Sequence, residues 1–131
     1  MVCADEAQED IVKSLGVSLA GPTKSDWAAP VYTCTYALTT GTMVLSVREL
    51  TDASTTISYF TSAQSTATQP VPLPGLGEGA FSAADGTVYV RKDYLILKVD
   101  VTGLADYVGQ PKLSRAAAGI RVAEIIMGCW R

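Results

Sequence analysis

Residues 31–38 read VYTCTYAL, and this stretch decides the fold. Its side chains alternate between two faces, with Tyr32, Cys34, Tyr36 and Leu38 on one of them. A period of two is the pattern of a β-strand with one buried face. A turn with Gly41 follows, and Met43–Leu50 (MVLSVREL) has the composition of a returning strand. The sequence therefore predicts an antiparallel hairpin as the first half of a sheet.

Three further strands are predicted in the second half of the chain. A short one contains Phe81, and Asp85-Gly86 after it is a strong turn signal. Thr87–Arg91 (TVYVR) and Tyr94–Val101 (YLILKVDV) then alternate like the first hairpin. The complete expectation is a sheet of about five strands.

Three helices are predicted, over Ala4–Leu15, Thr51–Gln64 and Lys112–Met127. The first and last of them carry apolar residues at helical spacing, and the first also has acidic residues in its opening turn. The middle helix is the weakest of the three, because its many serines and threonines are poor helix formers. The segments Ala20–Asp26 and Thr66–Pro74 are interpreted as polar, proline-containing connections.

This order of elements predicts an α+β fold. We expect a single antiparallel sheet, with the N-terminal, middle and C-terminal helices packed mainly on one face. The 131 residues fit a single domain over 1–131, and the chain has no internal repeat. Met1-Val2 has neither a basic segment nor an apolar one, so the chain is expected to be a mature domain from which any signal or lipobox segment is absent.

Composition excludes several partners. The net charge is −3 and the pI about 4.8, which argues against a nucleic-acid partner, whose phosphates require a basic surface. No apolar run approaches the ~20 residues of a membrane span. Only 18% of the residues are charged, against roughly 25% in an average soluble domain. Serine and threonine take their place, and such hydroxyl-rich surfaces are common in exported proteins.

Cysteine usage points to an oxidising compartment. The chain has three cysteines, Cys3, Cys34 and Cys129, and no histidine. Cys34 lies on the expected core face of its strand, where the terminal helices would cover it. Three single bridges are possible, and Cys3–Cys34 is preferred, with Cys129 as the alternative partner. Three reduced thiols in a cytosolic domain are the competing interpretation.

Several segments come in an order that resembles a group of small actinobacterial secreted lipoproteins of unknown function. They are Cys34-Thr35-Tyr36, the glycine-rich residues 75–81 (GLGEGAF), residues 85–88 (DGTV), residues 99–104 (VDVTGL) and residues 122–130 (VAEIIMGCW). The resemblance covers nearly the whole chain. It implies export and a membrane tether through an upstream lipid anchor, and it carries over no catalytic residue.

No motif predicts catalysis, a cofactor or a metal. Gly75-x-Gly77-x-Gly79 follows a proline loop and precedes a strand, which is the wrong context for a nucleotide-binding loop. The acidic residues near turns are expected to be solvated; they are Glu78, Asp85, Asp93, Asp100 and Asp106. Zinc would require four nearby ligands, and the chain has no Cys-x-x-Cys. We therefore expect no catalytic, cofactor-binding or metal-binding residue.

Trp27 is the residue most indicative of binding. It stands in a polar segment near Pro30, whereas core packing accounts for most of the other aromatic residues. The leading hypothesis is a non-catalytic domain of the cell envelope that binds an unknown small ligand or a protein partner. Its binding site is expected to be a cleft between the sheet and the helices, lined by aromatic residues. The alternative is a structural or interaction subunit of an extracellular assembly. An enzyme is a distant third.

Overall fold

The computed structural model describes residues 3–109 and 112–129, with only the backbone of Cys129. Its helices are α1 (Asp5–Leu15), α2 (Ala53–Thr66) and α3 (Arg115–Cys129). Its strands are β1 (Lys24–Ala28), β2 (Val31–Leu38), β3 (Gly41–Glu49), β4 (Val71–Pro72), β5 (Gly79–Ser82), β6 (Val88–Lys92), β7 (Leu95–Leu104), β8 (Tyr107–Val108) and β9 (Leu113–Ser114). The predicted α+β class is confirmed.

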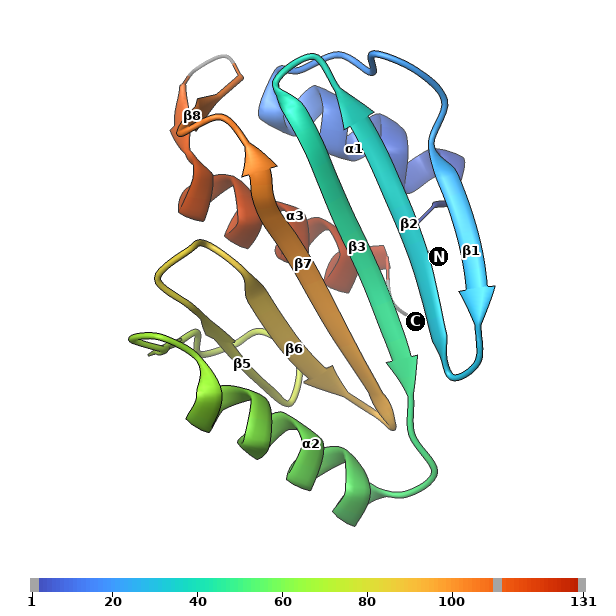
Figure 1. Ribbon diagram of the computed structural model, residues 1–131, viewed down its shortest axis with the longest axis vertical. Helices are drawn as coiled ribbons and strands as arrows, with labels where there is room; N and C mark the ends of the chain where they lie inside the picture. The colour runs from blue at the N-terminus through green and yellow to red at the C-terminus, as the bar shows by residue number, and fades with distance from the viewer. Residues whose placement is uncertain (1–2, 110–111, 130–131) are drawn as a thin grey trace.

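Seven strands form one antiparallel sheet in the order β1-β2-β3-β7-β6-β5-β4 (Figure 1). The predicted hairpin of β2 and β3 lies beside β7, the longest strand, so that Leu45 of β3 is paired with Val99 of β7. Strands β8 and β9 form a separate small sheet next to the start of α3. Strands β3 and β7, which are both rich in alternating apolar residues, therefore lie next to each other near the centre of the sheet.

The predicted count of about five strands in a single sheet is wrong. The five expected strands are present, but β1 and β4 add an edge on each side, and β8 and β9 form a second sheet. Every residue of β1 is exposed, and β4 contains Pro72. Such strands are held by backbone pairing with one neighbour, so they lack the apolar alternation that identifies a strand in a sequence.

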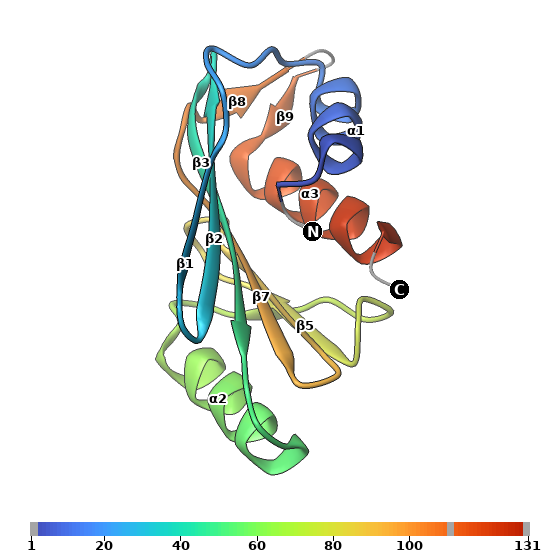
Figure 2. The same ribbon diagram turned by 90° about the vertical axis from the view of Figure 1, so that its right-hand side faces the viewer.

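The two terminal helices cover one face of the sheet, called here the inner face (Figure 2). Helix α1 buries Ala7, Ile11 and Leu15, and α3 buries residues that include Val122 and Ile126. The inner face of the sheet supplies the alternating residues that they cover; these are Cys34, Tyr36, Leu38, Met43, Leu45, Val47, Val88, Val90, Leu97, Val99 and Val101. Burial raises the pKa of the Tyr36 phenol, and nearby Tyr32 adds to this rise.

Helix α2 packs against the opposite face, called here the outer face. The Phe60 ring meets the Phe81 ring edge-on at 5.3 Å, and Phe81 stacks on Tyr89 at 5.0 Å. Tyr89 lies between Val88 and Val90 in β6, whose side chains belong to the inner core, so its own side chain faces outward. The prediction that all three helices pack mainly on one face is therefore wrong for α2.

Aromatic residues on the outer face explain this position of α2. Phe60 of α2 meets Phe81, which in turn stacks on Tyr89, and both strand residues occupy positions that the inner core does not use. The helix is held at its start by Asp52, whose side chain accepts a hydrogen bond of 2.7 Å from the Thr55 backbone N–H. Within the described residues, none of the helices has the length and apolarity needed to span a membrane.

Candidate functional site: a cleft at Trp27

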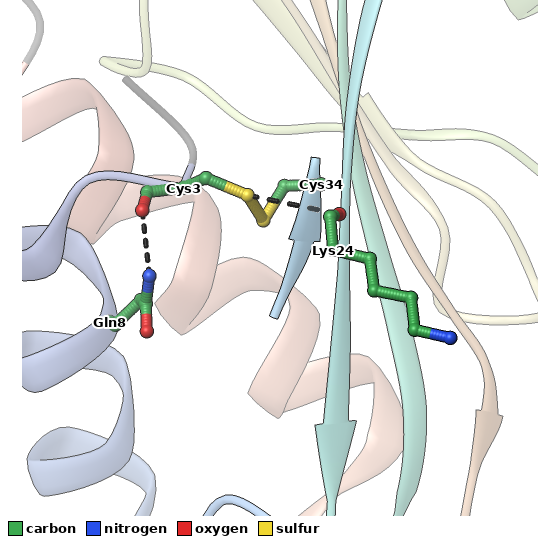
Figure 3. The surroundings of a disulfide bond; sticks show 4 residues. All are labelled: Cys3, Gln8, Lys24 and Cys34. Atoms are coloured by element: carbon green, nitrogen blue, oxygen red, sulfur yellow. Dashed lines mark hydrogen bonds between the residues drawn. A yellow bond between two sulfur atoms is a disulfide. The ribbon is translucent and has the colours of Figure 1, made fainter. Parts of the chain in front are cut away.

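A disulfide joins Cys3, just before α1, to Cys34 in β2 (Figure 3). Their Cα atoms are 5.5 Å apart, and Cys34 is fully buried. The Gln8 side-chain amide donates a hydrogen bond of 2.7 Å to the Cys3 carbonyl. This is the pairing that the sequence favoured over a bridge to Cys129, whose side chain lies outside the described part of the chain.

The bridge fixes the N-terminal helix to the inner face of the sheet. It spans a sequence separation of 31 residues, and a loop of that size corresponds to about 3 kcal/mol in the chain-entropy model. Among the described residues, no three His, Cys, Asp or Glu side chains gather in a group that could hold a metal ion. The two bridged cysteines cross-link the segment before α1 to β2.

Trp27 borders a cleft on the inner face of the sheet. The cleft has a volume of about 330 Å³ and is lined by Trp27, Tyr32, Val47, Glu49 and Leu95. We call it the Trp27 cleft. The Trp27 side chain is 53% exposed, whereas Val47 is buried at the floor. A large aromatic side chain is thus held at the mouth of an apolar hollow.

Four strands build this cleft through their register. Trp27 in β1 is paired with Tyr32 in β2, and Tyr32 is paired with Val47 in β3. Glu49, at the end of β3, is paired with Leu95 in β7. Because paired residues share a face of the sheet, the side chains converge although they come from distant parts of the chain.

The cleft is held by backbone hydrogen bonds at the end of the sheet. The Glu49 N–H donates to the Pro30 carbonyl at 2.9 Å, and the Leu50 N–H donates to the Tyr94 carbonyl at 2.8 Å. These bonds fix the β1–β2 turn and the β6–β7 turn to the end of β3. The walls are therefore formed before any ligand arrives, which lowers the entropy cost of binding.

The chemistry of the Trp27 cleft suits an apolar group that carries a hydrogen-bond donor or a positive charge. Trp27 and Tyr32 offer aromatic surfaces, and Val47 and Leu95 offer aliphatic ones. The only carboxylate in the lining is that of Glu49. An aromatic face and a carboxylate both attract a cationic group, and they repel an anion.

Trp27 was identified from the sequence, but its neighbours in the cleft were not. Tyr32 had been placed on the same strand face as Cys34, and this position is confirmed by its packing beside the inner core. Glu49, the last residue of β3, gave no signal, and Leu95, the first residue of β7, was expected only as part of an apolar strand face. Only the pairing of β3 with β7 brings the two together. The other exposed aromatic residues, Tyr59, Tyr94 and Tyr107, do not line this cleft.

No protein-family model, no curated protein and no solved structure matches this chain.

Proposed function

We propose that this protein is a non-catalytic, extracytoplasmic domain that binds a small ligand, or an apolar side chain of a protein partner, in the Trp27 cleft. The single observation that carries this proposal is the half-exposed Trp27 side chain at the mouth of a preformed apolar hollow. The volume of about 330 Å³ lies at the small end of the ~300–1,000 Å³ typical of ligand sites. It suits a small aromatic ring system, such as an indole, with a short substituent.

An extracytoplasmic location is supported by the Cys3–Cys34 disulfide, since such bridges persist mainly in oxidising compartments. A lipid anchor on an upstream segment is part of the same proposal, and the resemblance to secreted lipoproteins supports it. A non-catalytic role is supported by the lining of the cleft, in which Glu49 has no second carboxylate beside it. General acid–base pairs of the glycosidase type require two.

The ligand test uses three indole probes that differ in charge: tryptamine, indole and indole-3-acetate. Amide chemical shifts followed by NMR during titration would report the site and the affinity. We expect tryptamine to shift the amides of Trp27, Tyr32 and Glu49, with indole weaker and indole-3-acetate weakest, because Glu49 attracts the ammonium group. Trp27→Ala should abolish these shifts, and Glu49→Gln should remove the preference for tryptamine over indole.

Tyr107→Ala is the matched control, because Tyr107 is an exposed aromatic residue outside the cleft. It should leave all three titrations unchanged. If none of the probes shifts the cleft amides, or if Trp27→Ala binds them as well as the wild type, the Trp27 cleft is not the binding site.

The alternative, a subunit of an extracellular assembly, is favoured by one observation. Strand β1 forms an edge of the large sheet and all five of its residues are exposed, so its outer backbone groups are available to a strand of another chain. Analytical ultracentrifugation over a range of protein concentrations tests this. Self-association that is lost when β1 carries Ser25→Pro would support edge pairing, and a monomer at all concentrations would contradict pairing between copies.

A further inference from the structure

A second cavity lies on the outer face, away from the Trp27 cleft. Its volume is about 690 Å³, within the ~300–1,000 Å³ of small-molecule sites. It lies between the C-terminal end of α2 and the outward-facing residues of β6 and β7. Its lining consists of Ala63, Thr66, Ala67, Thr68, Ala83, Ala84, Asp85, Thr87, Tyr89, Lys98, Asp100 and Thr102. We call it the polar cavity.

We propose that the polar cavity binds a neutral, polyhydroxylated ligand, a monosaccharide or disaccharide. The proposal concerns a second site and does not depend on the Trp27 cleft. It rests on the combination of charges and hydroxyl groups in the lining and on the rigidity of the walls. It also rests on the polar atoms there that form no hydrogen bond or salt bridge within the described residues.

The charges in the lining exclude the simplest ionic ligands. One ammonium group, of Lys98, faces two carboxylates, of Asp85 and Asp100. The two carboxylates oppose an anion such as phosphate, and the ammonium group opposes a metal cation. A neutral ligand escapes both repulsions. It still forms charge-assisted hydrogen bonds with each of these groups, provided that it carries hydroxyl groups, which both donate and accept.

Several polar groups of the lining are available for such bonds. Both hydrogen bonds that Asp100 accepts from Thr102 go to the same oxygen, Oδ1, at 2.9 Å from the backbone N–H and 2.6 Å from the hydroxyl. Within the described residues, no hydrogen bond involves Asp100 Oδ2, and no carboxylate oxygen lies within salt-bridge distance of the Lys98 ammonium. The Lys98 ammonium lies over the Tyr89 ring, whose centroid is 5.8 Å from Nζ.

The walls of the polar cavity are held by hydrogen bonds of the protein itself. Ala84 N–H donates to the Thr68 carbonyl at 2.9 Å, which ties the segment after α2 to the turn between β5 and β6. In that turn, Asp85 accepts a bond of 2.9 Å from the Thr87 N–H. This backbone hydrogen bond is the main reason why the pKa of Asp85 is lowered. Asp85 is therefore an anion at neutral pH with a fixed orientation.

Glycine at position 86 fixes the turn next to Asp85. Gly86 has φ +92°, and a Cβ atom there would lie 2.9 Å from the Val101 side chain and 3.2 Å from the Ala116 Cα. The turn therefore packs directly on α3. Fixed walls of this kind reduce the entropy lost on binding a flexible, hydrated ligand.

A titration with neutral sugars tests the proposal. The probes are glucose, mannose, galactose, trehalose and maltose, with inorganic phosphate and glucuronate as charged comparators, and amide shifts are followed by NMR. We expect at least one neutral sugar to shift the amides of residues 83–87 and 98–102, and glucuronate to bind more weakly than glucose. Lys98→Met and Asp100→Asn should each weaken binding about tenfold, the value of one charge-assisted hydrogen bond.

Matched controls are Lys24→Met and Asp26→Asn, which change the same residue types on the exposed strand β1, outside the lining. They should leave sugar affinity unchanged, and the thermal unfolding midpoints of all four variants should equal that of the wild type. Three results would overturn the proposal: no neutral sugar shifts these amides, phosphate alone does so, or the Lys98 and Asp100 variants bind like the controls. None of these results bears on the Trp27 cleft, whose probes and variants are different.

Discussion

The two faces of the seven-stranded sheet differ in what covers them. The inner face lies under α1 and α3, is joined to the N-terminal segment by the Cys3–Cys34 disulfide and holds the apolar core. The outer face carries only α2, and the sole fully buried residue of that helix is Thr56. Charged and hydroxyl side chains lie there beside apolar ones such as Ile96; they include Ser46, Lys98 and Asp100.

This difference separates stability from recognition. Burial of apolar area and a cross-link stabilise the fold through the inner face. The outer face buries fewer apolar side chains, among them Phe81 and Ile96, which leaves positions on it that carry polar groups. Both proposed sites follow this division, because the Trp27 cleft lies where the inner face emerges from the helices and the polar cavity lies on the outer face.

The largest expected effect on stability comes from replacing, one at a time, two neighbouring residues that lie on opposite faces of the sheet. Leu45→Ala should lower the free energy of unfolding by about 3 kcal/mol, because Leu45 is fully buried and its truncation leaves a cavity in the inner core. Ser46→Ala, one position later on the outer face, should change it by less than about 0.5 kcal/mol. Urea unfolding measures both. Equal losses at the two positions would contradict the division between the faces.

The second effect is that of the disulfide. Cys3→Ala should lower the free energy of unfolding by about 3 kcal/mol, because it releases the loop between Cys3 and Cys34 in the unfolded chain. Reduction of the wild type with dithiothreitol should produce a similar loss. Amide hydrogen exchange should accelerate in α1 and not in α2, which packs on the other face. A variant as stable as the oxidised wild type would show that the bridge does not stabilise the inner face.

The smallest expected effect is a loss of stability at acid pH that is caused by two carboxyl groups, Asp52 and Asp85. Backbone hydrogen bonds from Thr55 and Thr87 lower the pKa values of Asp52 and Asp85, respectively. A carboxyl group whose pKa is lowered by folding stabilises the protein above its unfolded pKa of about 3.9, and this stabilisation is lost as the pH falls through the lower folded value. Stability should therefore decline below about pH 4.

The double variant Asp52→Asn/Asp85→Asn tests how much these two carboxylates contribute to the pH dependence of stability. It should show a shallower decline than the wild type in urea unfolding measured between neutral and acid pH. Asp5→Asn/Asp10→Asn on α1 is the control, with the same change of charge at exposed positions. If the outer-face variant has the same acid dependence as the wild type, these two carboxylates do not stabilise the folded state.

Much of the fold is predictable from local pattern. The alternation in β2, β3 and β7 identified these three segments as strands, because strands with one buried face must alternate. Helix α1 was predicted over Ala4–Leu15 and runs over Asp5–Leu15, since its apolar spacing and the Gly16 stop are local signals. Strands β1 and β4 were missed because an exposed edge strand has no such pattern.

The candidate sites depend more on tertiary structure. Trp27 was identified from its local sequence context, as an aromatic residue in a polar segment. Its partner Glu49 became recognisable only through the register of β3 and β7. The polar cavity gave no sequence signal at all, since Asp85 and Asp100 are ordinary turn and strand-face acids until the sheet brings them to Lys98.

The sequence by itself therefore determined the α+β class, the five main strands and the terminal helices, because these depend on the periodicity of nearby residues. The tertiary structure alone decided that α2 covers the opposite face, that an exposed strand extends the sheet next to Tyr32, and which side chains share a cavity. Those outcomes depend on which distant strands pair and in what register, and no local pattern contains that information.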